Sequence, residues 1–353
     1  MNVLVTGCSG YIGPILTRLL KERGHTVTGL DIGYFRECVD PGQKLVPLDR
    51  MIERDIRDAR PEDLDGVDCI IHLSAISNDP MGQLNPKITE DINFVATKRL
   101  AGMAKAAGIQ RFVMASSCSI YGAAHGSKDA LDESAPFNPV SAYAHSKVNS
   151  EAALQALADD DFSPVFMRNA TAYGVSPRVR FDLVLPNLMA WGMTTGVVKV
   201  MSDGTPWRPL VHIEDISLAA ACAAEAPRET VHNQAFNIGR NDANYQIRDI
   251  AEAVQRAASK VRDNVSLEIT GESGGDDRSY RVDFSKALSS LPGFNPNWTL
   301  DMGCEELVTW FQAHAGLTSE ITQNRLYVRL KQLQYLIETS RLDDHLRVCG
   351  PAL

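Results

Sequence analysis

The chain has 353 residues, of which 44% are apolar and 22% are charged, so it can bury a large core in roughly one to three domains. Its formal net charge of −9 argues against nucleic-acid binding, because sequence-independent binding needs clustered Lys and Arg side chains. An anionic ligand would therefore have to be held by a local group of basic residues.

The seven cysteines are odd in number, scattered, and without a CxxC pair. This spacing argues against a disulfide framework and a metal site, and it favours a reducing, cytoplasmic location. The opening sequence MNVLVTG becomes polar too early for a signal peptide, and no apolar run approaches the ~18 residues of a membrane span. We therefore expect no contact with a membrane.

The first half of the chain alternates strand and helix patterns. Short apolar strands are predicted at residues 3–6, 26–30, 52–56, 69–73, 111–115 and 164–167. Helices are predicted at residues 10–21, 91–107 and 142–157. Strands that alternate with helices indicate parallel βαβ units, so the predicted fold class is α/β with a doubly wound parallel sheet.

The second half is less regular and is interrupted by proline and glycine. It contains predicted helices at residues 213–224 and 247–259, and a strand at 235–238 that could rejoin the sheet. We expect a smaller α/β lobe that is interleaved with the sheet. Near the C-terminus, an apolar stripe with helical spacing predicts an amphipathic helix that packs on its own subunit or on another one. The stripe consists of Leu326, Leu330, Leu333 and Ile337.

The first strand-to-helix turn has the sequence TGCSGYIG, with glycines at positions 7, 10 and 13. Gly7, Gly10 and Gly13 allow a tight turn and a close approach of the backbone to a pyrophosphate, which sits at the helix N-terminus. Asp31 closes the second strand, where a carboxylate accepts hydrogen bonds from ribose hydroxyls and repels a 2′-phosphate. The pattern therefore predicts a dinucleotide site that favours NAD over NADP. Asp55 and Ile56 follow the third predicted strand, where an adenine edge would lie.

Tyr143 and Lys147 are four residues apart in SAYAHSK and share one face of a predicted helix. A nearby ammonium stabilises a phenolate, so Lys147 could turn Tyr143 into a base. Ser117 follows the fifth strand at its C-terminal end, where ligands of such sheets bind. We predict Ser117, Tyr143 and Lys147 as the catalytic residues. Cys118 is expected in the wall of the pocket, and His145 is expected to be structural.

Taken together, these motifs resemble those of the extended short-chain dehydrogenases/reductases. Within that group, residues 2–315 resemble the NAD-dependent sugar-nucleotide epimerases and dehydratases. The motifs that carry the resemblance are TGCSGYIG, Asp31, Asp55–Ile56, IHLSA, Asn93, SSCSIYG and YAHSK. The resemblance implies a Rossmann domain at residues 1–168 and a substrate-binding lobe at 169–317, and the expected helical tail at 318–353 lies beyond the family's usual end. It also implies a homodimer formed through the helices around residues 93–107 and 142–157.

The resemblance further implies which residues contact the ligands, with Asn93 supporting the active-site helix. The expected NAD contacts are Gly7, Gly10, Tyr11, Ile12, Gly13, Asp31, Asp55, Ile56, Leu73, Ala75, Tyr143 and Lys147. The expected contacts to a nucleoside-diphosphate sugar are Ser77, Thr171, Asn187, Arg208, Asp276 and Arg278. Five arginines, whose planar guanidinium groups suit a diphosphate, supply positive charge in an acidic chain. They are Arg178, Arg180, Arg208, Arg278 and Arg281.

Residues near Ser117 differ between the enzymes of the family that catalyse different reactions. The 4,6-dehydratases carry an acidic pair where this chain has Cys118 and Ser119, and no acidic residue adjoins Ser117 as a decarboxylase would require. The fucose-forming epimerase/reductases use a later His where this chain has Leu183, and Asp31 argues against a pure NADPH-dependent ketoreductase. The expected enzyme is therefore an NAD-dependent epimerase that inverts sugar carbon 4 through a 4-keto intermediate. The alternatives are an NAD(P)H-dependent keto-sugar reductase or another oxidoreductase or dehydratase of the family, and a dinucleotide-binding regulator without chemistry.

Overall fold

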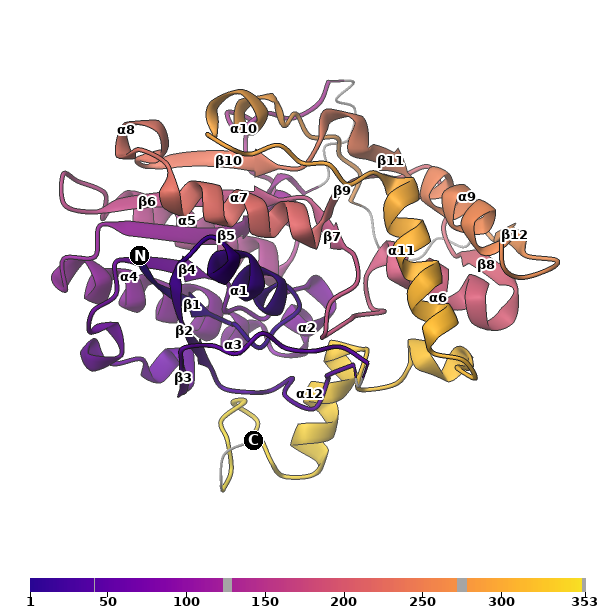
Figure 1. Ribbon diagram of the computed structural model, residues 1–353, viewed down its shortest axis with the longest axis horizontal. Coiled ribbons are helices and arrows are strands. Elements are labelled where there is room, and N and C mark those ends of the chain that lie inside the picture. Colours follow the sequence, from indigo (N-terminus) through magenta and orange to yellow (C-terminus); the bar gives the residue numbers. More distant parts are fainter. Residues whose placement is uncertain (41, 123–128, 272–277, 351–353) are drawn as a thin grey trace.

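The computed structural model describes residues 1–40, 42–122, 129–271 and 278–350, and its larger lobe is built around a parallel sheet (Figure 1). Seven strands form this sheet in the order β10-β6-β5-β4-β1-β2-β3, and every neighbouring pair is parallel. The strands are β1 (Asn2–Thr6), β2 (Thr26–Asp31), β3 (Arg50–Glu53), β4 (Cys69–His72), β5 (Arg111–Ser117), β6 (Ser163–Asn169) and β10 (Gln234–Ile238). The predicted α/β class with a doubly wound parallel sheet is confirmed.

Helices cover both faces of the sheet, which explains why β4 and β6 are buried along their whole length. One face packs against α1 (Gly13–Glu22) and α7 (Ile213–Glu225), and the other packs against α4 (Ala96–Ala106) and α5 (Ala142–Gln155). Shorter helices, α2 (Asp79–Leu84) and α3 (Pro86–Glu90), follow β4 on the second face. The carboxyl ends of the strands therefore remain free to carry a site.

Two predicted elements of this lobe differ from their observed form. The predicted strand at residues 52–56 ends at Glu53, because the Asp55 side chain accepts a hydrogen bond from the Arg57 amide and begins a 3₁₀ turn (Ile56–Asp58). The predicted helix at residues 91–107 begins with a π-helical turn (Asp91–Val95) before α4. Single π turns of this kind are common near functional sites.

The second lobe lies beside the large sheet (Figure 1), and it carries a separate apolar core. Its strands are β7 (Thr171–Tyr173), β8 (Val197–Val200), β9 (Trp207–His212), β11 (Asn244–Gln246) and β12 (Ser266–Ile269). Its main helices are α6 (Val184–Thr195), α9 (Ile247–Ala258) and α11 (Leu300–Ala313). Between them the chain returns to the large sheet, where β10 pairs with β6, and the short helices α8 (Arg228–Val231) and α10 (Ser285–Ser290) pack nearby. The strand predicted at residues 235–238 thus rejoins the sheet as expected, and the lobes are interleaved.

The tail contains a 3₁₀ turn (Ser319–Thr322) and the helix α12 (Arg329–Glu338), which lies beside the first lobe (Figure 1). Leu333 and Leu336 are buried in the core that also contains α4 and α5. The amphipathic helix is therefore present and packs on its own chain. No helix in the described ranges is long and apolar enough to cross a membrane.

Candidate active site

A cavity of about 460 Å³ lies at the carboxyl ends of the parallel strands, between the two lobes. Its walls come from the turn after β1, the ends of β2, β4 and β5, the start of α5, and loops of the second lobe. This is the position at which doubly wound sheets bind their ligands.

The glycine turn after β1 faces the cavity at the N-terminus of α1. Gly7 has φ +71°, and a Cβ atom there would lie 2.7 Å from the backbone nitrogen of Ser74. A Cβ atom on Gly13 would lie 2.1 Å from the Cys8 carbonyl oxygen. Only glycine fits these two positions, so the backbone can approach a bound phosphate closely. Gly10, Tyr11 and Ile12 line the same part of the cavity.

Asp31 lies at the end of β2 and also lines the cavity. Its carboxylate accepts hydrogen bonds from the Gly33 amide at 2.7 Å and the Ser9 amide at 3.0 Å. Burial raises the pKa of Asp31, while these amides and the charge of Arg178 act in the opposite direction. The carboxylate is thus held beside the glycine turn, where a ribose next to the pyrophosphate would lie.

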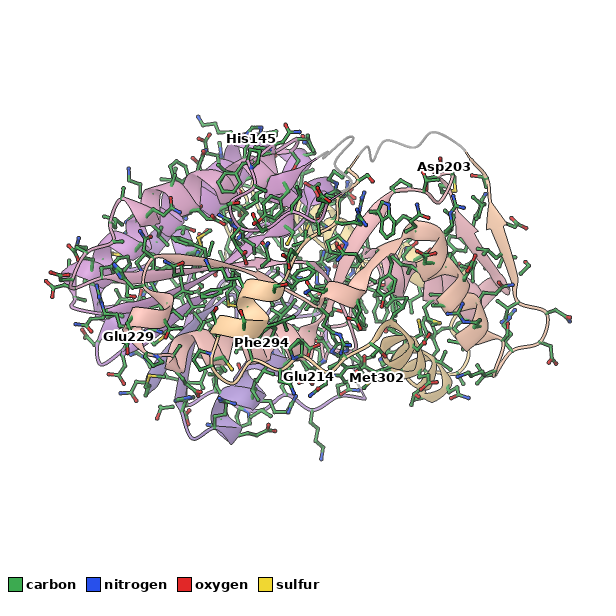
Figure 2. All side chains as sticks on the ribbon, turned by 90° about the horizontal axis from the view of Figure 1, so that it is seen from above. His145, Asp203, Glu214, Glu229, Phe294 and Met302 are labelled. Atoms are coloured by element: carbon green, nitrogen blue, oxygen red, sulfur yellow. The ribbon has the colours of Figure 1, made fainter. Side chains whose placement is uncertain are left out.

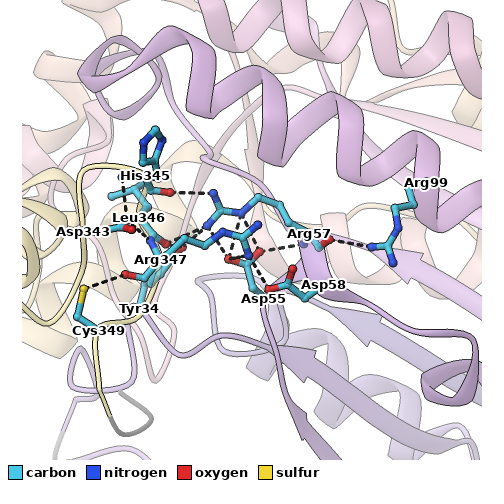
Figure 3. A network of polar contacts seen from close by, with 10 residues as sticks. All are labelled: Tyr34, Asp55, Arg57, Asp58, Arg99, Asp343, His345, Leu346, Arg347 and Cys349. Atoms are coloured by element: carbon cyan, nitrogen blue, oxygen red, sulfur yellow. Dashed lines mark hydrogen bonds and ion pairs between the residues drawn. The ribbon is translucent and has the colours of Figure 1, made fainter.

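The other expected cofactor contacts line the cavity as well. Asp55 and Ile56 form its wall beyond β3, and Leu73 and Ala75 follow β4. The Asp55 carboxylate is bound by the Arg57 guanidinium, whose Nη2 lies 2.5 Å from Oδ2 (Figure 3). Asp55 therefore has a structural partner that the sequence motif did not reveal.

Ser117, Tyr143 and Lys147 line the same cavity. Ser117 ends β5, and its hydroxyl accepts a hydrogen bond from the Ser119 amide at 3.1 Å. Tyr143 and Lys147 lie on the first turns of α5, which Ser141 caps by accepting a hydrogen bond from the Ala144 amide. The structure therefore brings the three predicted catalytic residues together.

The protonation of Tyr143 depends on its surroundings. Its pKa is raised to about 12, with burial as the main cause and a hydrogen bond with Ser117 opposing the rise. The charge of Asp79 raises this pKa further, whereas the charges of Arg180 and Arg278 lower it. Tyr143 thus holds its proton in the free protein, and its ability to act as a base depends on Ser117 and on nearby cations.

Lys147 is buried, and its Nζ donates a hydrogen bond to the Ala115 carbonyl oxygen at 2.7 Å. Burial lowers the pKa of Lys147 to about 8, and the negative charge of Glu151 raises it. Its Nζ lies 5.8 Å from the centre of the Tyr143 ring. The amine is therefore fixed beside the tyrosine, as the i, i+4 spacing predicted.

Two groups of residues that do not line the cavity stabilise this centre. Glu151 is buried on α5 and forms an ion pair with buried Arg168 at 2.7 Å, while it also accepts a hydrogen bond from Ser116. Asn93, in the π-helical turn, donates to the Ser146 hydroxyl at 3.1 Å and exchanges hydrogen bonds with the Ile76 backbone. The expected support of α5 by Asn93 is therefore present. The Glu151–Arg168 pair was missed, because no local motif links residues that far apart.

The expected substrate contacts divide into three groups. Ser77, Thr171, Arg208 and Arg278 line the cavity, whereas Asp276 lies outside the described residues. Asn187 does not line the cavity. Its side-chain amide donates a hydrogen bond to the Phe181 carbonyl oxygen at 2.8 Å, so it holds the loop before α6. The structure therefore does not bring Asn187 to the cavity wall with the other expected contacts, and its contact with a substrate stays a prediction.

Of the five arginines predicted as a group, three line the cavity and two make other contacts. Arg180, Arg208 and Arg278 line the cavity. Arg178 instead donates to the Phe35 and Arg36 carbonyl oxygens, and the Arg281 guanidinium lies 5.2 Å from the centre of the Trp207 ring.

Four further charged residues line the cavity without having been predicted as ligand contacts: Arg54, Asp79, Asp182 and Arg329. Asp79 forms an ion pair with Arg278 across the two lobes, and Asp182 pairs with Arg180 at 2.8 Å. Arg329 comes from α12 and is buried, and its amide donates to Asp182. Asp79 lies in the polar, proline-containing loop SNDP after β4, which is the local signal that could have pointed to one of them.

Cys118 and His145 do not line the cavity. The Cys118 thiol is buried, which raises its pKa, and it donates a hydrogen bond to the Arg168 carbonyl oxygen at 3.1 Å. His145 points outward from α5 at the protein surface (Figure 2). Across the described ranges, no group of three His, Cys, Asp or Glu side chains could hold a metal ion.

The chain is similar in sequence and in fold to known proteins. The sequence model of the NAD dependent epimerase/dehydratase family matches residues 3–239. A UDP-glucose 4-epimerase of Corynebacterium glutamicum is 26% identical over 315 residues, covering 85% of this chain and 92% of the relative. A dTDP-glucose 4,6-dehydratase of Streptomyces griseus is 28% identical over 324 residues, covering 89% of this chain and 94% of the relative. Among solved structures, MoeE5 in complex with UDP-glucose and NAD superposes with a TM-score of 0.73 at 26% identity, covering 89% of this chain and 99% of that one.

Proposed function

The chain belongs to the NAD-dependent epimerase/dehydratase family, and we propose that it inverts carbon 4 of a nucleoside-diphosphate sugar through a transient 4-keto form. The observation that carries this proposal is the meeting of Ser117, Tyr143 and Lys147 in one cavity, with no carboxylate at positions 118 and 119. The 4-epimerases among its relatives support the same choice.

The protein uses NAD as its cofactor, and the described residues fit this dinucleotide. The glycine turn leaves room for a pyrophosphate, and the Asp31 carboxylate lies beside it to accept hydrogen bonds from ribose hydroxyls. When bound, NAD supplies a positively charged ring that accepts a hydride and returns it. The residues of the chain have to orient the sugar and move the proton.

Tyr143 is the group that would exchange a proton with the 4-hydroxyl of the sugar. Its Oη takes the proton when the hydroxyl becomes a ketone, and it returns the proton when the hydroxyl is restored on the other face. Ser117 would share a hydrogen bond with the same sugar oxygen and orient it. Lys147, fixed by the Ala115 carbonyl oxygen, places a cation near the phenolate. No net oxidation or reduction results.

The positive charge that the second lobe brings to the cavity suits the diphosphate. Arg208 and Arg278 line the cavity, and both come from the second lobe. Guanidinium groups bind phosphate oxygens with two parallel hydrogen bonds, so these residues are the proposed diphosphate contacts. Ser77 and Thr171 are the proposed sugar contacts.

A dehydratase is the second candidate, because the cavity contains the carboxylates of Asp79 and Asp182. A dehydration needs an acid or base beside the keto group, in addition to Tyr143. Both carboxylates form ion pairs with arginines, which favours a structural role for them. The homodimer, the cytoplasmic location and the boundaries of the three segments remain predictions.

The experiment that separates these reactions follows hydrogen atoms. Nucleoside-diphosphate sugars deuterated at carbon 4 are incubated with the purified protein in ordinary water, and the products are analysed by NMR and mass spectrometry. An epimerase keeps the deuterium at carbon 4, reverses the configuration there and consumes no added NADH. The same sugars, unlabelled and in heavy water, should gain no deuterium at carbon 3 or 5.

Substitution of Tyr143 by Phe removes the proton-carrying oxygen and should lower turnover by about 10²–10⁴-fold while NAD binding is retained. Tyr335→Phe, on α12, is the matched control with normal turnover expected. Solvent deuterium at carbon 5 together with loss of water would establish dehydration instead, and net consumption of NADH would establish a reductase. Undiminished turnover of the Tyr143→Phe protein would overturn the assignment of the catalytic residue.

A further inference from the structure

The chain after α12 folds back on itself as a small hairpin, here called the C-terminal hairpin (residues 341–349). Leu342 and Val348 pair as an antiparallel bridge, and the Cys349 amide donates to the Arg341 carbonyl oxygen at 2.9 Å. The Asp343 carboxylate accepts hydrogen bonds from the amides of His345 and Arg347, at 2.8 and 2.7 Å. Its own hydrogen bonds therefore define the shape of the hairpin.

Apolar side chains and backbone contacts fasten the C-terminal hairpin to the cofactor lobe. Leu342 and Leu346 are buried in a core that includes Tyr34. The Tyr34 hydroxyl donates a hydrogen bond to the Leu346 carbonyl oxygen. Arg57 donates to the carbonyl oxygens of Leu346 at 2.9 Å and His345 at 2.7 Å (Figure 3). Undocking would expose two leucines and break three hydrogen bonds to backbone oxygens.

An ion-pair network joins the C-terminal hairpin to the expected adenine-contact segment. Arg347 Nη1 lies 2.5 Å from an Asp58 oxygen and 3.2 Å from an Asp55 oxygen (Figure 3). Asp55 is buried and lines the main cavity, and Arg57 binds the same carboxylate. The residue that was expected to face adenine is therefore also a fastening point of the hairpin.

A second cavity, of about 290 Å³, lies between the hairpin and the sheet. The hairpin contributes Arg347 and Val348 to its wall. Ile32, Arg54 and Asp55 line both this cavity and the main one, so the two spaces adjoin. They adjoin beyond β2, at the end of the site where Asp31 would hold the adenosine ribose.

We propose that the C-terminal hairpin is a strap that forms the outer wall of the adenosine pocket, and that NAD is released only when this strap undocks. Arg347 makes the main polar contacts that hold the strap in place, and Leu342 and Leu346 make the apolar contacts. Local opening of such a docked segment is rare, so release of the dinucleotide becomes slow. A slow release suits any reaction that regenerates its NAD in each turnover, and the proposal holds whichever sugar is the substrate.

The exchange of bound NAD tests the strap without any sugar. Protein loaded with NAD is mixed with excess isotopically labelled NAD, and the bound fraction is recovered over time and identified by mass spectrometry. Arg347→Ala should exchange about five- to tenfold faster than the wild type, since it loses its ion pairs with Asp55 and Asp58.

Arg23→Ala provides the matched control. Arg23 forms an ion pair with Glu225 between α1 and α7, and its side chain is 33% exposed against 38% for Arg347. Neither cavity includes Arg23, so its substitution should leave exchange unchanged. Exchange of the Arg347→Ala protein at the wild-type rate would overturn the strap, while leaving the proposed reaction untouched.

Hydrogen exchange of the unmodified chain gives a readout that needs no substitution. Bound NAD should protect the backbone amides of residues 341–349, because their exchange requires the hairpin to open. Equal protection of these amides with and without NAD would contradict the proposal. If NAD is released as slowly as these amides exchange, one opening of the hairpin controls both processes.

Discussion

At the scale of single residues, the proton of Tyr143 is the feature on which catalysis depends. Its pKa is raised to about 12, chiefly by burial, so the phenol stays protonated at neutral pH. Ser117 provides the largest opposing contribution, and Arg180 and Arg278 add positive charge. Ser117 should therefore do more than orient the sugar, because it also makes Tyr143 a stronger acid.

A Ser117→Ala substitution tests this role through the pH dependence of kcat/KM. Tyr143 acts as a base only when deprotonated, so kcat/KM should rise with pH up to the tyrosine pKa. Loss of the Ser117 hydrogen bond raises that pKa, so the rising limb should move upward by about one pH unit and kcat/KM near neutral pH should fall about tenfold. Ser289→Ala, on the exposed helix α10, should leave the profile in place. A lower rate with an unmoved limb would mean that Ser117 orients the substrate only.

At the scale of secondary-structure elements, β4 carries a buried histidine between two threonines. His72 Nδ1 lies 2.7 Å from Thr6 Oγ1 on β1, and Nε2 lies 2.7 Å from Thr97 Oγ1 on α4. Burial, together with the charge of Lys147, lowers the pKa of His72 to about 3. The imidazole thus stays neutral in the folded sheet and joins the sheet to the helix that covers it.

This histidine should make the fold sensitive to mild acid. Below its unfolded pKa of about 6.5, His72 binds a proton in the unfolded chain but not in the folded one. The free energy of unfolding therefore decreases as the pH is lowered. The loss should reach about 2 kcal/mol between about pH 6.5 and pH 5. Urea unfolding at both pH values should show a smaller loss for His72→Gln. His145→Gln, at the surface, is the control, and equal pH dependence of both variants would refute this role of His72.

At the scale of the whole molecule, a buried carboxylate joins the two lobes. Asp40 follows β2, and its carboxylate accepts a hydrogen bond from the Trp310 indole at 2.6 Å and contacts His314 Nε2 at 2.8 Å. Both partners lie on or directly after α11 of the second lobe. Burial lowers the pKa of His314, but hydrogen bonds with the Trp310 carbonyl oxygen and with Asp40 raise it overall.

Removal of this carboxylate by Asp40→Ala should lower the free energy of unfolding by about 2–3 kcal/mol, because a buried indole loses its acceptor. A raised histidine pKa stabilises the fold below the unfolded pKa of about 6.5, and this contribution disappears as the pH rises through the folded pKa. The cost of Asp40→Ala should therefore be larger at about pH 6 than at about pH 8. Asp301→Ala, in an exposed ion pair, should cost less than about 0.5 kcal/mol. A cost that does not change with pH would exclude the contribution of His314.

Much of the fold and half of the active site could be predicted from local patterns. The glycine turn, the acidic end of β2 and the YxxxK helix each depend on neighbours within a few residues, so their geometry follows from steric rules and helix periodicity. The predicted NAD contacts and Ser117, Tyr143 and Lys147 all line one cavity. Their shared position follows from the parallel sheet, whose strands all end at the same edge.

Only the tertiary structure decided which distant charges meet. Asn187 turned out to hold the Phe181 carbonyl oxygen, and Arg329 reached the cavity from the tail. The amphipathic stripe predicted a helix, but it could not say that the chain beyond it would reach Asp55. Sequence periodicity specifies which face of an element is apolar, whereas the partner of that face, and of each buried charge, is determined by the packing of segments far apart in the chain.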